Sequence, residues 1–133
     1  MTASITYTGL LHTTAVHTQS GTTIATDAPT DNNGLGQAFS PTDLVATALG
    51  SCMLTVMGIK ARQMNIAIEE TKVEINKIMA NDPRRIQEIQ VTLQFPNNVY
   101  SDKDKQILEH TAMTCPVFLS LHPDVKKTVN FIW

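Results

Sequence analysis

The chain has 133 residues, of which 42% are hydrophobic, 17% charged and 5% aromatic, with a formal net charge of −2. This length predicts a single domain, over residues 1–133. The charge balance gives no basic surface of the kind that nucleic acids and anionic membranes require. No secretory signal is visible, and the apolar, uncharged run over residues 44–59 is too short to span a bilayer. We therefore expect a cytoplasmic protein that binds neither nucleic acid nor membranes.

Three segments rich in threonine and isoleucine predict β-strands in the first third of the chain. They cover residues 4–9, 12–18 and 21–28, and glycine, serine and proline break them. Residues 29–39 contain proline, two asparagines and two glycines, a composition that predicts a loop.

A long apolar helix is predicted next. Ser40 is a good N-cap, Pro41 suits the first helical position, and Asp43 completes a capping box. Two apolar rows follow, Leu44, Ala48, Cys52 and Val56, and Val45, Leu49, Met53 and Met57. We expect this helix to be buried over most of its surface. One small sheet covers only one side of such a helix, so we predict a homodimer that packs two of them between two sheets.

The remaining segments predict a second β region and two helices. Residues 71–79 and 89–95 alternate apolar and polar side chains around a turn at residues 81–85, which indicates an antiparallel hairpin. Ser101 and Asp104 predict the start of a helix over residues 101–113. A short helix over residues 115–121 and a strand over residues 128–133 follow. The fold class is α+β, with antiparallel sheet.

Cys52 and Cys115 are the candidate reactive groups. An ordinary thiol, with a pKa of about 8.5, is mostly protonated at neutral pH and reacts as the thiolate. Cys115 precedes Pro116, so it is a candidate N-cap at the positive end of a helix dipole, which predicts a lowered pKa. Cys52 lies three turns into its helix and needs a cationic or hydrogen-bonding neighbour to become reactive.

Inert core cysteines are the more common interpretation of two thiols in a cytosolic domain. A redox pair is the alternative. A zinc site is a weaker one, because the sequence contains no C-x-x-C or H-x-x-x-H motif.

Two segments resemble the OsmC/Ohr family. Residues 40–57, SPTDLVATALGSCMLTVM, resemble its central-helix motif, and residues 115–133, CPVFLSLHPDVKKTVNFIW, resemble its C-terminal cysteine segment. The resemblance implies an OsmC-like fold, with antiparallel sheets wrapped around a long buried central helix in an intertwined homodimer. It also implies a thiol peroxidase that reduces organic hydroperoxides at the dimer interface, without a cofactor.

The resemblance also implies roles for residues. Cys52 aligns with the family's peroxidatic cysteine and Cys115 with the resolving one. Asp43 stands where relatives carry a glutamate that helps to hold an active-site arginine. No arginine precedes Arg62 in this chain. By the resemblance, His12 stands at the position of the family's arginine. An external dithiol, lipoyl-type in the best-known relatives, would restore both thiols.

His12 leaves the mechanism open. A neutral imidazole can hydrogen-bond a thiolate, and only a protonated one supplies charge. Either His12 forms an ion pair with Cys52, another base substitutes, or peroxidase activity is weak. The alternative functions are a non-catalytic dimer that binds a small hydrophobic or thiol ligand, and a structural dimer with inert cysteines. We expect the remaining candidates to be surface or structural residues. They are His17, His110, His122, Arg84 and Arg85.

Overall fold

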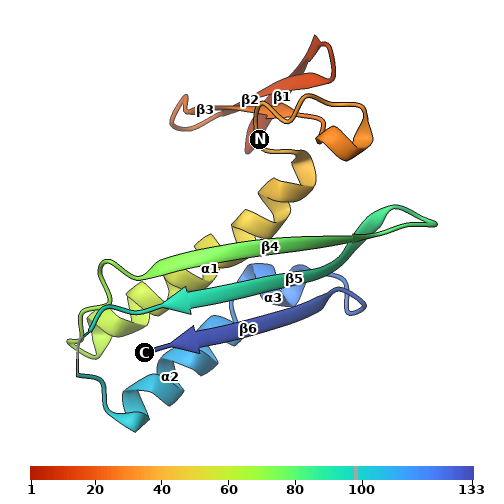
Figure 1. The fold of residues 1–133 in the computed structure, drawn as a ribbon. Coiled ribbons are helices and arrows are strands. Elements are labelled where there is room, and N and C mark those ends of the chain that lie inside the picture. Colours follow the sequence, from red (N-terminus) through yellow and green to blue (C-terminus); the bar gives the residue numbers. More distant parts are fainter. Residues whose placement is uncertain (98) are drawn as a thin grey trace. The chain divides into compact units, whose positions relative to one another are not determined.

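The computed structural model describes residues 1–97 and 99–133 (Figure 1). Its contacts divide the chain into two compact units, Met1–Val45 and Ala46–Trp133. The single domain over residues 1–133 stays a prediction.

The first unit holds a three-stranded antiparallel sheet in the order β1-β2-β3. Its strands are Ala3–Gly9, His12–His17 and Thr23–Asp27, as the threonine-rich segments predict. Leu10 and Leu11 form the two-residue turn between β1 and β2, with φ angles of 52° and 65°. A loop with one 3₁₀ turn, η1 (Thr30–Asn32), follows β3.

The second unit holds the sheet β4-β5-β6. Its strands are Lys72–Ala80, Arg85–Gln94 and Lys126–Ile132. β4 and β5 form the predicted antiparallel hairpin. β6 runs parallel to β5, so the prediction of wholly antiparallel sheets is wrong. The reason is topological, because helices α2 (Asp102–Met113) and α3 (Pro116–Ser120) form a crossover that returns the chain to the starting end of β5.

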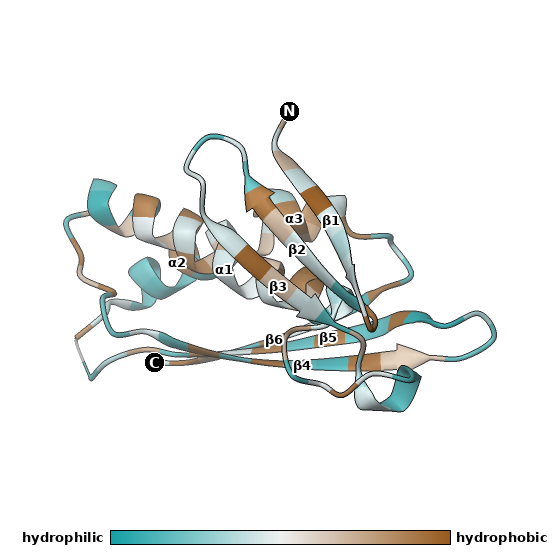
Figure 2. Cartoon of the chain, turned by 90° about the horizontal axis from the view of Figure 1, so that it is seen from above, coloured by the Kyte–Doolittle hydropathy of each residue, from teal (hydrophilic) through white to brown (hydrophobic). Residues whose placement is uncertain are grey.

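The helices of the second unit cover one face of its sheet (Figures 1 and 2). Helix α1, Pro41–Gln63, starts in the first unit and contributes most of its length to the second. Its buried row packs with β5 and α2 into one core. The fully buried members are Leu49, Met53, Met57, Ile89, Leu93 and Leu108. At the end of this core Phe95 stacks on Trp133, with ring centroids 3.8 Å apart.

Helix α1 is less buried in a single chain than the sequence predicts. The row of Leu49, Met53 and Met57 is buried, whereas Thr55 and Ile59 on another side are exposed. One sheet and one neighbouring helix cover only one side of α1. By length and composition alone α1 is long and apolar enough to cross a membrane, and 33% of its most apolar 18-residue stretch is buried. The core helices of soluble proteins can be equally long and apolar. The homodimer that would cover the other side stays a prediction.

We expect Gly50→Ala to lower the free energy of unfolding by about 1–3 kcal/mol, because an added methyl group overpacks this core. Its Cβ would lie 2.7 Å from Ile75 Cδ1 and 3.0 Å from Val73 Cγ1. Gly58→Ala is the matched control on the same helix, since its Cβ would meet nothing within 4 Å. Urea unfolding measures both variants. A Gly50→Ala protein as stable as the wild type would contradict this packing.

Candidate functional site

The two cysteines come together in the second unit. Cys52 lies in the middle of α1 and packs against the core, and Cys115 belongs to the core itself. Both thiols are free. A hydrogen bond and charge repulsion from Cys52 both act on the pKa of Cys115, so the two sulfurs are near neighbours. The sequence predicts this meeting only through the family resemblance, because 62 residues separate the two positions.

Local sequence places Cys115 at the N-cap of α3. Its backbone is extended, with φ −65° and ψ 148°, and Pro116 takes the first helical position. The Phe118 N–H donates a hydrogen bond to Cys115 Sγ at 3.4 Å. The N-cap prediction is therefore confirmed.

The predicted lowering of the pKa of Cys115 is wrong. Burial raises the pKa of this thiol, and the hydrogen bond and charge of Cys52 raise it further. The N–H groups of Phe118 and Val117 lower it, by less. Cys115 is only 1% exposed, and α3 has only five residues. Desolvation of the charged form therefore outweighs the small helix-end effect.

Burial distinguishes the two thiols. Cys52 is half-buried, whereas Cys115 is buried. In the single chain a solvent-borne reagent therefore reaches Cys52 first. Cys115 is shielded from such a reagent.

His12 pairs with an aspartate that sequence reasoning missed. His12 opens β2, and the register places Asp27, the last residue of β3, directly opposite. His12 Nε2 lies 3.4 Å from Asp27 Oδ1, and their side chains are 28% and 0% exposed. The predicted hairpin could have revealed this pair, because the turn between β2 and β3 fixes the register and so places Asp27 opposite His12.

Asp27 is held in its ionised form. The Gln37 N–H donates to Asp27 Oδ2 at 2.9 Å, and this bond lowers the pKa of the carboxyl below its ordinary value of 3.8. Burial opposes the shift, while the charge of His12 and the N–H groups of Ala28 and Leu35 add to it. A lowered pKa contributes stability at neutral pH that is lost only as the pH falls through the folded-state value, below 3.8.

Asp43 caps helix α1. Its Oδ2 accepts a hydrogen bond from the Ser40 N–H at 2.8 Å. Its own N–H donates to Ser40 Oγ at 3.1 Å. This reciprocal pair confirms the capping box. A role for Asp43 in holding an active-site cation stays a prediction.

The other candidate histidines and arginines are exposed. His17 Nδ1 lies 2.7 Å from Ser20 Oγ in the β2–β3 turn. His122 Nδ1 lies 3.7 Å from Asp124 Oδ2 in the turn after α3. The Arg85 guanidinium donates to the carbonyl of Pro83 at 2.9 Å. Arg84 lies in the same turn, and His110 lies on α2. Within residues 1–97 and 99–133, no group of three His, Cys, Asp or Glu side chains gathers as a metal site.

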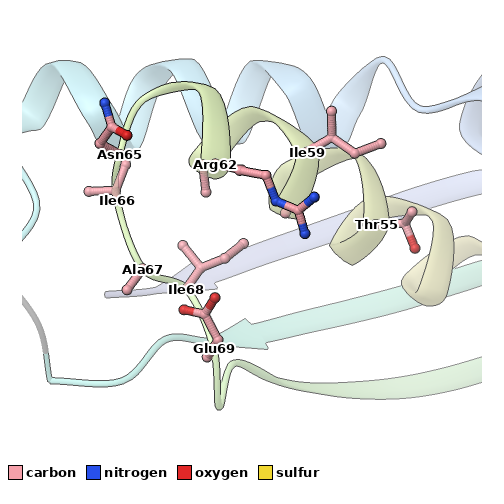
Figure 3. A pocket seen from close by; sticks show the side chains of 10 residues that line it. Thr55, Ile59, Arg62, Asn65, Ile66, Ala67, Ile68 and Glu69 are labelled. Atoms are coloured by element: carbon pink, nitrogen blue, oxygen red, sulfur yellow. The ribbon is translucent and has the colours of Figure 1, made fainter.

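A pocket of about 640 Å³ opens at the C-terminal end of α1, in the second unit (Figure 3). Ile59, Ile66 and Ile68 give it apolar walls, and Arg62 and Glu69 add one charge of each sign. The cysteines do not line it. This volume suits a small organic ligand.

Comparison with known proteins identifies the family. A family model described as OsmC-like protein matches residues 34–130. The chain belongs to the OsmC-like family. A crystal structure from Psychrobacter arcticus 273-4, described as a proposed osmotic stress induced and detoxification response protein, is 52% identical, with a TM-score of 0.94. That match covers 98% of this chain and 95% of the other. None of the curated proteins compared with the chain matches it.

More distant structures show the same fold. An organic hydroperoxide resistance protein OsmC from Legionella pneumophila is 14% identical, with a TM-score of 0.78, and the match covers 100% of this chain and 98% of that one. The organic hydroperoxide resistance protein OhrB of Bacillus subtilis is 17% identical, with a TM-score of 0.71, and the match covers 98% of each chain. The α+β fold and the OsmC/Ohr resemblance are confirmed.

We expect iodoacetamide to alkylate Cys52 at least about tenfold faster than Cys115 in the native protein, because exposure and thiolate population both control thiol reactivity. Time-resolved peptide mass spectrometry measures both rates, and the urea-unfolded protein is the control in which the two rates converge. Faster labelling of Cys115 in the native protein would contradict the assigned burial and pKa direction.

Proposed function

We propose that this OsmC-like protein reduces organic hydroperoxides, with Cys52 as the peroxidatic thiol and Cys115 as the resolving thiol. The contact between the two thiols in one unit carries the proposal. The order of the roles follows from burial, because the peroxide must reach the first thiol and only the second thiol needs to reach the first. The hydroperoxide resistance proteins of the same fold support the substrate class.

The first step oxidises Cys52. Its thiolate attacks the outer oxygen of the hydroperoxide, the O–O bond breaks, and the released alkoxide takes a proton to leave as an alcohol. Cys52 becomes a sulfenic acid. The apolar side chains that pack around it, such as Met53 and Phe118, suit a bulky organic peroxide.

The second step joins the two sulfurs. Cys115 attacks the Cys52 sulfur, a disulfide forms, and the hydroxyl group leaves as water with the proton of Cys115. Oxidation of Cys52 also removes the thiolate whose charge raises the pKa of Cys115. The resolving thiol therefore becomes more acidic at the moment it has to react.

Completion of the cycle calls for an external dithiol, of the lipoyl type or similar, that reduces the disulfide by exchange and is itself oxidised.

We propose a cytoplasmic homodimer in which a second copy covers the exposed side of α1. We also propose that His12 takes the role of the family's arginine, and that Asp43, at the start of α1, helps to hold the active-site arrangement.

A second function has its own support. The pocket at the end of α1 has apolar walls and lies apart from the cysteines, and no arginine precedes Arg62. A dimer that binds a small hydrophobic or thiol ligand without turnover fits these two observations.

We expect one equivalent of cumene hydroperoxide to convert the wild-type protein to an intramolecular disulfide, with the loss of two hydrogens by intact mass. Cys115→Ser is expected to stop at a sulfenic acid that dimedone traps, since serine keeps the N-cap but cannot resolve. Cys52→Ser is expected not to react. Wild-type protein that stays reduced under stoichiometric peroxide would contradict the peroxidase and favour ligand binding.

A further inference from the structure

We propose that the pocket at the C-terminal end of α1 binds an aliphatic amino acid, with the ligand's carboxylate on Arg62 and its ammonium group on Glu69. The proposal rests on the ligand-binding function and not on the peroxidase, because neither cysteine lines this pocket. All the residues that carry it lie in the second unit.

Backbone structure fixes the walls of the pocket. Asn65 adopts a left-handed conformation, with a φ angle of 56°, just after α1 ends. The Ile66 N–H donates a hydrogen bond to the Ala61 carbonyl at 3.0 Å. The Tyr100 hydroxyl donates to the Ala67 carbonyl at 2.8 Å. These bonds hold the segment after α1 in place without a ligand, and a preformed site lowers the entropic cost of binding.

The apolar part of the lining suits a branched aliphatic side chain. Ala61 and Ile68 are buried, Ile66 is half-buried and Ile59 is exposed. The volume of about 640 Å³ is ample for a small organic molecule. A ligand in this pocket would therefore remove apolar surface from water, both its own and that of the isoleucines.

Two opposite charges line the same pocket without pairing. The Arg62 guanidinium comes from α1 and the Glu69 carboxylate from the segment after it (Figure 3). Both side chains are exposed. Among residues 1–97 and 99–133, neither forms an ion pair with the other or with a third charged group. Each of them is therefore available to a ligand.

This pair of charges selects the ligand class. A guanidinium binds a carboxylate through two parallel hydrogen bonds, and a carboxylate accepts hydrogen bonds from an ammonium group. A ligand with a single charge would satisfy one residue and bring a like charge toward the other. A neutral apolar ligand would take water from both charges without replacing it. An amino acid with an aliphatic side chain satisfies both charges and the apolar walls together.

The test is a calorimetric titration of the reduced wild-type protein with millimolar L-leucine. Two analogues keep the branched side chain and one charge each. Isocaproate lacks the ammonium group, and isoamylamine lacks the carboxylate. We expect L-leucine to bind about tenfold or more tightly than either analogue, because each analogue loses a charge-assisted hydrogen bond.

Arg62→Gln and Glu69→Gln assign the two charges. We expect Arg62→Gln to weaken L-leucine binding about tenfold without weakening that of isoamylamine, and Glu69→Gln to do the same without weakening that of isocaproate. The matched controls are Lys60→Gln, in the same turn of α1, and Glu70→Gln, next to Glu69. Neither Lys60 nor Glu70 lines the pocket, so both controls are expected to bind L-leucine as the wild type does.

Absence of L-leucine binding to the wild type would overturn the proposal. Equal affinities for L-leucine and either analogue would overturn it too, and would leave a ligand-binding protein with a simpler ligand. A control variant that weakens binding as much as Arg62→Gln or Glu69→Gln would show a general charge effect, against the proposal. The analogues test the wild-type protein, so the result stands even if a variant does not fold.

A second copy of the chain is the competing occupant, because Thr55 and Ile59 line the pocket and also lie on the exposed side of α1. Light scattering distinguishes the two. Dissociation of a wild-type dimer in Arg62→Gln or Glu69→Gln, without L-leucine binding to the wild type, would assign the pocket to the second copy and overturn the proposal. No step uses peroxide, so oxidation of Cys52 and Cys115 is tested separately.

Discussion

The contact between a half-buried thiol and a buried one is the constraint on which the proposed chemistry of this protein depends. Cys52 is held by α1, whose Leu49 and Met53 are anchored in the core. Cys115 is held by the turn into α3, where Pro116 ends one helix and starts the next. Because both supports are regular elements of one core, the two sulfurs are preorganised. The proposed disulfide between them depends on this packing.

The same burial that brings the thiols together works against the ionisation of Cys115. Desolvation raises the pKa of Cys115, so the second unit cannot supply a thiolate from that residue at neutral pH without help. In the first unit, backbone N–H groups keep Asp27 ionised, and Asp27 lies beside His12.

Local patterns predicted most of the fold. The capping boxes at Ser40 and Ser101 and the N-cap at Cys115 depend on neighbouring residues, and all three are present. Features that depend on long-range packing were not predictable in the same way. The direction of β6 follows from a crossover rather than from its own residues, and the pKa of Cys115 follows from burial that no local pattern reveals. Asp27 was missed because its importance depends on the strand opposite.

A crystal structure of the protein after oxidation by one equivalent of an organic hydroperoxide tests the central claim most directly. The account predicts a bond of about 2.05 Å between Cys52 Sγ and Cys115 Sγ of the same chain, with α1 and α3 in place. An oxidised Cys52 beside an unbonded Cys115 would contradict it, because the buried thiol would then not be the resolving group.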